Sequence, residues 1–155
     1  MWSSKRAGAR KLVLACLSAC FVASSMSQSP NSDHSTLVVV GRRDIEADKL
    51  SAEQVARIYF RQATSLPTGA PVEPLDLREG SPLYIDFYSR VTGKSPAQVR
   101  AYWARQSFSG MGIPPRQFAS TSDVIKVVLK TPGTIAYIPK KDLEDELKVL
   151  LDIGK

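Results

Sequence analysis

The sequence has few of the residues that form disulfides, bind transition metals or act as bases in nucleophilic catalysis. Both cysteines, Cys16 and Cys20, lie in the first 20 of the 155 residues, and the single histidine is His34. The chain after residue 34 therefore has no disulfide, no Cys/His metal site and no histidine base. No pair of carboxylates stands in a recognisable acid–base context, so we expect a protein that is not an enzyme and uses no metal or cofactor.

A strong excess of one charge is also missing once the first residues are set aside. The formal net charge of +6 comes from 21 Lys and Arg against 15 Asp and Glu, and four of those cations lie in the first eleven residues. The rest of the chain has 17 cations against the same 15 acids, and no stripe of Lys and Arg alternates with aromatic residues. Nucleic acid is therefore not an expected partner.

The N-terminal apolar run is too short to span a bilayer as a mature helix. Four basic residues precede "LVLACLSACFVA", the order found in export signals. Within it, "LSAC" resembles the bacterial lipobox, in which the cysteine is acylated and the chain is cut just before it. We predict a lipoprotein-type signal peptide over residues 1–19 with lipidation at Cys20. Ordinary secretion with cleavage near Ala23-Ser24-Ser25 and a pair of unmodified cysteines are the alternatives.

Residues 20–35 are rich in Ser and other polar residues, which predicts a flexible tether between the signal and a folded domain. The domain is expected over residues 36–155. A chain that is 43% hydrophobic and 23% charged has the composition of a globular protein, and its length leaves room for one core only.

Strand-like and helix-like patterns alternate through this domain, which predicts a mostly parallel sheet covered by helices on both sides. Ser51, Ser81 and Ser95 are expected to cap helices, and Pro82 and Pro96 suit the first helical position. Aromatic residues at helical spacing, Tyr59, Phe87, Tyr102 and Trp103, are expected in the core. Strands are expected at 36–40, 72–77, 134–138 and about 149–151, helices at 51–62, 82–92, 96–108 and 121–131, a loop at 109–116, and a short acidic helix after residue 140.

The order of several motifs resembles the phosphate-specific periplasmic binding proteins of ABC transporters, which are type II clamshell receptors. The motifs are "LSAEQVARIYF", "PVEPLDLREGSP" and "VIKVVLKTPGTIAYI", together with "YW…FSGMGIPP", which is typical of short stand-alone relatives. The resemblance implies an α/β domain in three layers, like the second lobe of such a receptor, in the periplasm. It also implies a role in phosphate uptake or sensing.

The resemblance further implies where an anion would bind. In the family, the sequence Arg-x-x-x-Ser-Gly-Thr at a helix start holds phosphate. The serine matches Ser81, whereas Pro82 stands in place of the glycine and Leu83 in place of the threonine. The arginine position falls on Leu77, so Arg78 is one position off.

These residues predict a candidate oxyanion site, because free amides and the helix dipole at a helix start favour negative charge. We expect Gly80, Ser81, Leu83 and the amide of Tyr84 to contribute, helped by Arg78. A second helix start at Ser120, Thr121 and Ser122 is a further candidate. The simpler interpretation is that both serine-rich starts only cap helices.

Inorganic phosphate or a similar small anion, weakly bound, is thus the expected partner. The alternative function is an envelope domain that has lost its ligand and binds another protein or a second copy of itself. Contact with the membrane is expected only through the lipid anchor.

Overall fold

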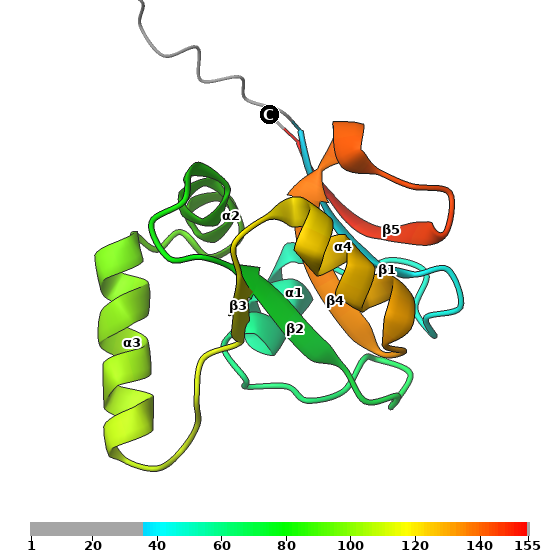
Figure 1. Cartoon of the computed structure of the whole chain (residues 1–155). Coiled ribbons are helices and arrows are strands. Elements are labelled where there is room, and N and C mark those ends of the chain that lie inside the picture. Colours follow the sequence, from blue (N-terminus) through cyan, green and yellow to red (C-terminus); the bar gives the residue numbers. More distant parts are fainter. Residues whose placement is uncertain (1–35, 155) are drawn as a thin grey trace, which may run out of the picture. The chain divides into compact units, whose positions relative to one another are not determined.

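The computed structural model describes residues 36–154, so the predicted signal peptide, Cys20 and tether lie outside the described residues. The chain divides into two units, Met1–Ser32 and Asp33–Lys155, and every described element belongs to the second (Figure 1). The elements in order are β1 (Leu37–Arg42), α1 (Ala52–Tyr59), β2 (Glu73–Leu77), α2 (Pro82–Thr92), α3 (Pro96–Phe108), β3 (Arg116–Phe118), α4 (Thr121–Lys130), β4 (Thr134–Pro139), the 3-10 turn η1 (Lys140–Asp142) and β5 (Leu147–Ile153).

Five strands form one sheet in the order β3-β2-β4-β1-β5. β2 pairs in parallel with β3 and with β4, whereas β1 is antiparallel to both of its neighbours, β4 and β5. Four strands therefore run in one direction and β1 alone runs in the other, which confirms the expected mostly parallel sheet. The reversed β1 was not foreseen, because a continuous apolar run indicates burial on both faces but not strand direction.

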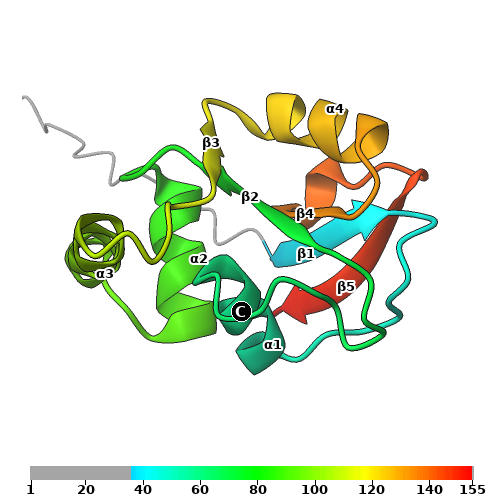
Figure 2. The same ribbon diagram turned by 90° about the horizontal axis from the view of Figure 1, so that it is seen from below.

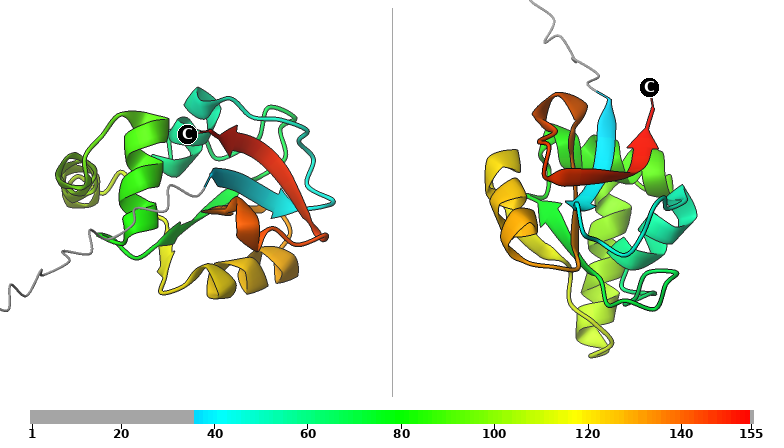
Figure 3. Two further views of the ribbon diagram at one scale, coloured as in Figure 1. Left: turned by 90° about the horizontal axis from the view of Figure 1, so that it is seen from above. Right: turned by 90° about the vertical axis from the view of Figure 1, so that its right-hand side faces the viewer.

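Helices cover both faces of this sheet (Figures 2 and 3). α4 packs on one face against β4, β1 and β2, and α1 and α2 pack on the other face against β2. α3 lies outside α2, where it packs against that helix. The three-layer α/β architecture expected from the sequence is thus confirmed. None of the helices within residues 36–154 is both long and apolar enough to cross a bilayer.

Serine side chains begin the helices as expected. Ser51, Ser81 and Ser95 each accept a hydrogen bond from the backbone N–H three residues later. The side-chain oxygens of Gln54 and Gln98 also accept a hydrogen bond from the backbone N–H of the capping serine, which completes a capping box in α1 and α3. These starts depend on residues within one helical turn, which is why the sequence predicts them.

Aromatic side chains form the centre of the core between the sheet and the α1–α2 layer. The rings of Phe87 and Tyr137 stack with centroids 3.9 Å apart, and Tyr59 contacts both. Tyr59, Phe87 and Trp103 are buried as predicted. Tyr102 is only half-buried and its hydroxyl donates to the carbonyl of Phe60.

Two predictions about short elements were wrong. Residues 116–118, which the sequence left without a strand, form β3, because three residues carry no periodicity of their own and pairing with β2 makes the strand. The acidic helix after residue 140 is only the 3-10 turn η1, and β5 already begins at Leu147. Pairing with β1 along the whole of β5 outweighs the local helical preference of this segment.

Candidate functional site

The candidate anion-binding residues sit at the edge of the sheet where β2 and β3 end. Leu77 pairs with Phe118, and the N–H of Arg78 donates to the carbonyl of Phe118 at 2.9 Å. A turn follows, closed by a bond of 3.1 Å from the N–H of Ser81 to the carbonyl of Arg78, and α2 begins after it. Ligands of α/β proteins generally bind beyond the carboxyl ends of parallel strands, so the position is suitable.

The start of α2 offers fewer donors than a helix start usually does. The hydroxyl of Ser81 accepts from the N–H of Tyr84 at 3.3 Å, so the expected amide of Tyr84 is already used. Ile85 donates to the carbonyl of Ser81, and Pro82 has no N–H. Among residues 36–154, the amides of Gly80 and Leu83 find no partner. Gly80 is exposed, and its φ of 81° is one that glycine adopts readily.

Charge near this turn is balanced rather than strongly positive. Arg78 is exposed and forms no ion pair with any described residue. Its neighbour Glu79 accepts a bond of 2.6 Å from Nε of Arg100, on α3. The pair neutralises Glu79, which leaves Arg78 as the cation nearest in sequence to Gly80 and Ser81.

The second candidate helix start lies at the same edge but is occupied by acids. Ser120 caps α4, and its hydroxyl bonds to the carboxylate of Asp123 at 2.7 Å. Thr121 donates to Asp142 at 3.3 Å, and the hydroxyl of Ser122 lies 3.0 Å from that of Ser120. Residues 120–122 follow shortly after β3, the strand that pairs with β2, but their hydroxyls are committed to each other or to carboxylates. Two negative groups there oppose an anion.

The most unusual polar residue of this edge, Asp76, was not among the site residues predicted from the sequence. It is 2% exposed, and it accepts bonds from the hydroxyls of Tyr137 at 2.6 Å and Tyr88 at 2.8 Å. Burial raises the pKa of the Asp76 carboxyl to about 6, although the bonds from Tyr137, Tyr88 and the N–H of Leu77 act in the opposite direction. Burial and the nearby Asp76 raise the pKa values of both tyrosines.

Asp76 connects three elements directly beneath the candidate site. The carboxylate belongs to β2, Tyr88 to α2 and Tyr137 to β4, and Leu77 also donates to the hydroxyl of Tyr137 at 3.2 Å. The cluster therefore sets the position of α2 relative to the end of β2. The signal available in the sequence was one carboxylate in the otherwise apolar run "PLDL" of an expected strand.

Several cavities lie in the folded domain. One of about 230 Å³ lies between Asp76, Glu79, Arg100 and Trp103, and another of about 230 Å³ lies beside α1. One of about 490 Å³ lies between α4 and η1, and one of about 430 Å³ lies at the opposite edge of the sheet. None of these is lined by Gly80, Ser81 or Leu83, although Glu79 and Tyr84, beside the α2 start, line the first of them.

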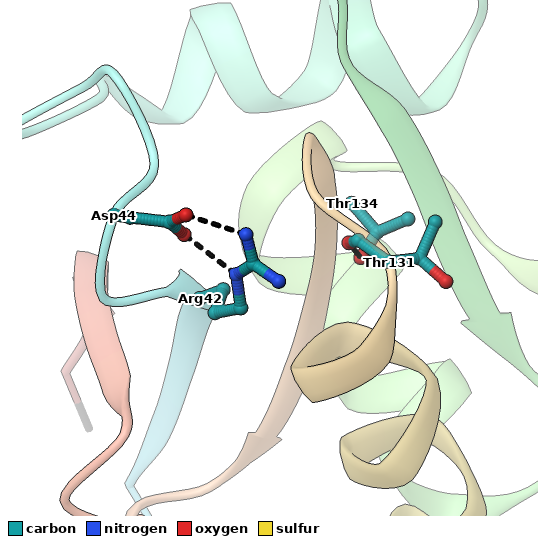
Figure 4. Close-up of polar contacts among 4 residues, drawn as sticks. All are labelled: Arg42, Asp44, Thr131 and Thr134. Carbon is teal, nitrogen blue, oxygen red and sulfur yellow. Dashed lines mark hydrogen bonds and ion pairs between the residues drawn. The ribbon is translucent and has the colours of Figure 1, made fainter.

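The cavity at the opposite edge has an acidic lining that does not suit an anion. Asp44, Glu46 and Glu73 contribute to it. Arg42 is the adjacent cation, but its guanidinium is held by both carboxylate oxygens of Asp44 (Figure 4). Thr134, also drawn there, donates to the carbonyl of Thr131 at 2.8 Å.

Within the described part of the chain, no three His, Cys, Asp or Glu side chains are grouped so that they could hold a metal ion.

Comparison with known proteins relates this fold to phosphate-transport receptors. No family model and no curated protein matches the sequence. Among solved structures, the chain is similar to a putative phosphate ABC transporter substrate-binding protein with bound phosphate from Clostridium perfringens, with a TM-score of 0.60 and 14% identity over 75% of this chain and 44% of that one.

Two further solved structures have a similar fold. An ABC-type phosphate transport receptor from Vibrio cholerae matches with a TM-score of 0.57 and 14% identity over 75% of this chain and 45% of that one. PstS from Borrelia burgdorferi matches with a TM-score of 0.54 and 16% identity over 75% of this chain and 46% of that one. The chain thus spans less than half the length of these proteins, consistent with the single lobe expected from the sequence. At such low identity, the likeness establishes the fold alone.

Proposed function

We propose that the chain is a non-enzymatic, solute-binding-like module that binds phosphate or a related oxyanion weakly at the start of α2. The observation that carries this proposal is the exposed turn 78–81 at the carboxyl edge of β2, where the amides of Gly80 and Leu83 have no partner among the described residues. The exposed Arg78 adds a cation, and the positive end of the α2 dipole adds a further attraction. The likeness to a receptor with bound phosphate supports this choice of ligand.

Weak binding follows from what the turn does not provide. Pro82 has no N–H, Leu83 has no hydroxyl, and Ser81 already accepts the N–H of Tyr84. Each polar partner missing from such a site costs roughly 1–3 kcal/mol, so two of them reduce affinity by about thirtyfold to more than about ten-thousandfold. The site also lies on an open surface rather than between two lobes, so we expect dissociation constants in the millimolar range.

We further propose that the module acts outside the cytoplasm, in the cell envelope, as part of phosphate uptake or sensing. The predicted signal peptide at residues 1–19 and the predicted lipidation of Cys20 support this location. Mass spectrometry of membrane fractions is the test. We expect an acylated N-terminal cysteine in the native chain and loss of acylation in Cys20→Ala. A native chain whose Cys20 carries no acyl group would contradict the anchor.

Anion binding is tested by calorimetric titration of the unit Asp33–Lys155 with phosphate and then with sulfate. The variant Ser81→Ala removes the cap and one oxygen of the proposed site, and we expect it to weaken binding by at least about fivefold. Ser95→Ala is the matched control, because Ser95 caps α3 through the same Ser-Pro device but at another helix start. It is expected to lower helix stability by a similar amount without changing the affinity for phosphate.

Arg78→Gln extends the test to the charge. It should weaken phosphate binding more at low salt than at high salt, since an exposed cation acts through a screened interaction. An absence of measurable heat at millimolar anion, or equal losses in Ser81→Ala and Ser95→Ala, would refute the proposed site.

A further inference from the structure

A second surface, far along the chain from the α2 turn, exposes large apolar side chains. We call residues 107–115, which run from the last turn of α3 to the residue before β3, the apolar loop. Phe108 is 97% exposed, Met111 74% and Ile113 72%. The other exposed large hydrophobic residues of the described chain, Ile85 and Leu143, reach only 42% and 38%. The loop therefore presents its apolar side chains to solvent to a degree found nowhere else in residues 36–154.

The outer side of α3 continues this apolar surface. Ala97, Ala101 and Ala104 are exposed, and their spacing places them on the same helical face as Phe108. α3 is the outermost helix of its layer and packs through its other side on α2 (Figure 1). The exposed face of α3 and the apolar loop thus form one continuous band.

The charged residues in this stretch of the chain have one sign. From Phe87 to Ser122 the sequence has no Asp or Glu, but it contains Arg90, Lys94, Arg100, Arg105 and Arg116. Arg90 and Arg100 are paired with Asp86 and Glu79. Arg105 and Arg116 flank the apolar loop, are exposed and form no ion pair with a described residue, although the guanidinium of Arg116 lies over the ring of Phe118.

We propose that the outer face of α3 and the apolar loop form a contact surface for an anionic lipid bilayer, in addition to the lipid anchor through which alone the sequence predicts membrane contact. Phe108, Met111 and Ile113 enter the boundary between head groups and acyl chains, and Arg105 and Arg116 lie at the level of the lipid phosphates. This arrangement favours a bilayer over a folded protein, because three side chains standing separately on a Gly- and Pro-rich loop need a surface that deforms around each of them. The cations suit the lipid phosphates of an anionic membrane surface, and the apolar side chains suit its acyl chains.

Vesicle sedimentation tests the proposal with the unit Asp33–Lys155, which is compact by itself and lacks the predicted anchor. One set of vesicles is pure phosphatidylcholine, and the other contains equal parts of phosphatidylcholine and phosphatidylglycerol. We expect binding to the mixed vesicles that weakens with salt, and much weaker binding to the neutral ones.

Two variants separate the apolar contribution from the charge. Phe108→Ser should weaken binding to the mixed vesicles by roughly tenfold or more. Leu143→Ser, which changes a less exposed apolar residue next to η1, should leave binding unchanged. Arg105→Glu should weaken binding by roughly thirtyfold, whereas Lys130→Glu on α4, across the sheet, should have little effect. Since Phe108 is 97% exposed, its replacement should leave the circular dichroism spectrum unchanged, and Ile113→Ser provides a second apolar test.

Several results would overturn the proposal. One is equal binding to neutral and anionic vesicles, and another is no binding to either. A third is weaker vesicle binding by Arg105→Glu with unchanged binding by Phe108→Ser and Ile113→Ser, which indicates adsorption by charge alone. Light scattering completes the test. A concentration-dependent dimer that Phe108→Ser abolishes, together with no vesicle binding, would assign the surface to a second copy of the chain.

Discussion

At the scale of single residues, Asp76 is the only charged side chain that is buried within residues 36–154. Its carboxylate is buried among Tyr88, Tyr137 and Tyr59, and three donors compensate only part of the lost hydration. The pKa of about 6, against a usual 3.8, means that folding favours the protonated form. The contribution of this group to stability is therefore fully present below about pH 4 and is lost as the pH rises through about 6.

The gain in stability at low pH leads to a prediction for the variant Asp76→Asn. When the pH falls from about 7 to about 4.5, the free energy of unfolding of the native chain should rise relative to that of the variant by about 2 kcal/mol, because only the native chain takes up a proton on folding. Urea unfolding at the two pH values measures the difference.

Asp44→Asn is the matched control for this experiment. The bond from Arg42 lowers the pKa of the Asp44 carboxyl below its usual 3.8, so its contribution is still almost fully present at about pH 4.5 and the difference between the native chain and Asp44→Asn should stay nearly constant. A constant difference between the native chain and Asp76→Asn would show that Asp76 stays ionised throughout.

At the scale of elements, the same Ser-Pro helix start occurs in two different surroundings. α2 and α3 both begin with Ser-Pro, but α2 begins at the carboxyl edge of β2 and α3 begins outside the sheet layer. Position in the sheet, not the cap itself, makes the start of α2 a candidate site.

The junction between α4 and β4 has a backbone conformation that requires glycine at position 133. Gly133 has a φ of 75°, a Cβ there would lie 2.9 Å from the carbonyl oxygen of Pro71, and its own carbonyl accepts from Glu73. Gly133→Ala should therefore lower the free energy of unfolding by roughly 2–4 kcal/mol, through backbone strain and the displaced carbonyl.

Gly93→Ala provides the comparison for this prediction, measured in the same urea titration. Gly93 has a φ of 65° but nothing within 4 Å of its Cβ position, so the loss should be only about 1 kcal/mol. Equal losses in the two variants would mean that the contact with Pro71 has no energetic effect.

At the scale of the whole domain, the reversed strand β1 joins the parallel half of the sheet to β5. Its residues Leu37 to Val40 are fully buried, because β4 and β5 cover its two edges and α4 packs against it. β5 adds Leu147, Leu150 and Ile153 to the core. The last strand of the chain thus protects the most apolar strand of the sheet.

Removal of Leu147–Lys155 is expected to abolish folding. Three buried side chains worth about 1.5–3 kcal/mol each would be lost, against a total stability of about 5–15 kcal/mol, and the apolar β1 would become an exposed edge. Expression of this truncation should yield insoluble protein by sedimentation. Removal of residues 1–32 should leave a soluble, folded unit, since Asp33–Lys155 is compact by itself. A soluble, cooperatively folded C-terminal truncation would contradict the role assigned to β5.

The sequence by itself determined the helix starts, the buried β1 and the α/β class, because caps act within one turn and apolar runs report burial locally. It also indicated the lobe-like fold through the order of its motifs and placed the candidate turn at Gly80 and Ser81. Only the tertiary structure decided the direction of β1, the existence of β3 and the partners of Asp76. These features depend on pairing between distant segments, such as Asp76 and Tyr137, which are 61 residues apart, and no local pattern records such contacts.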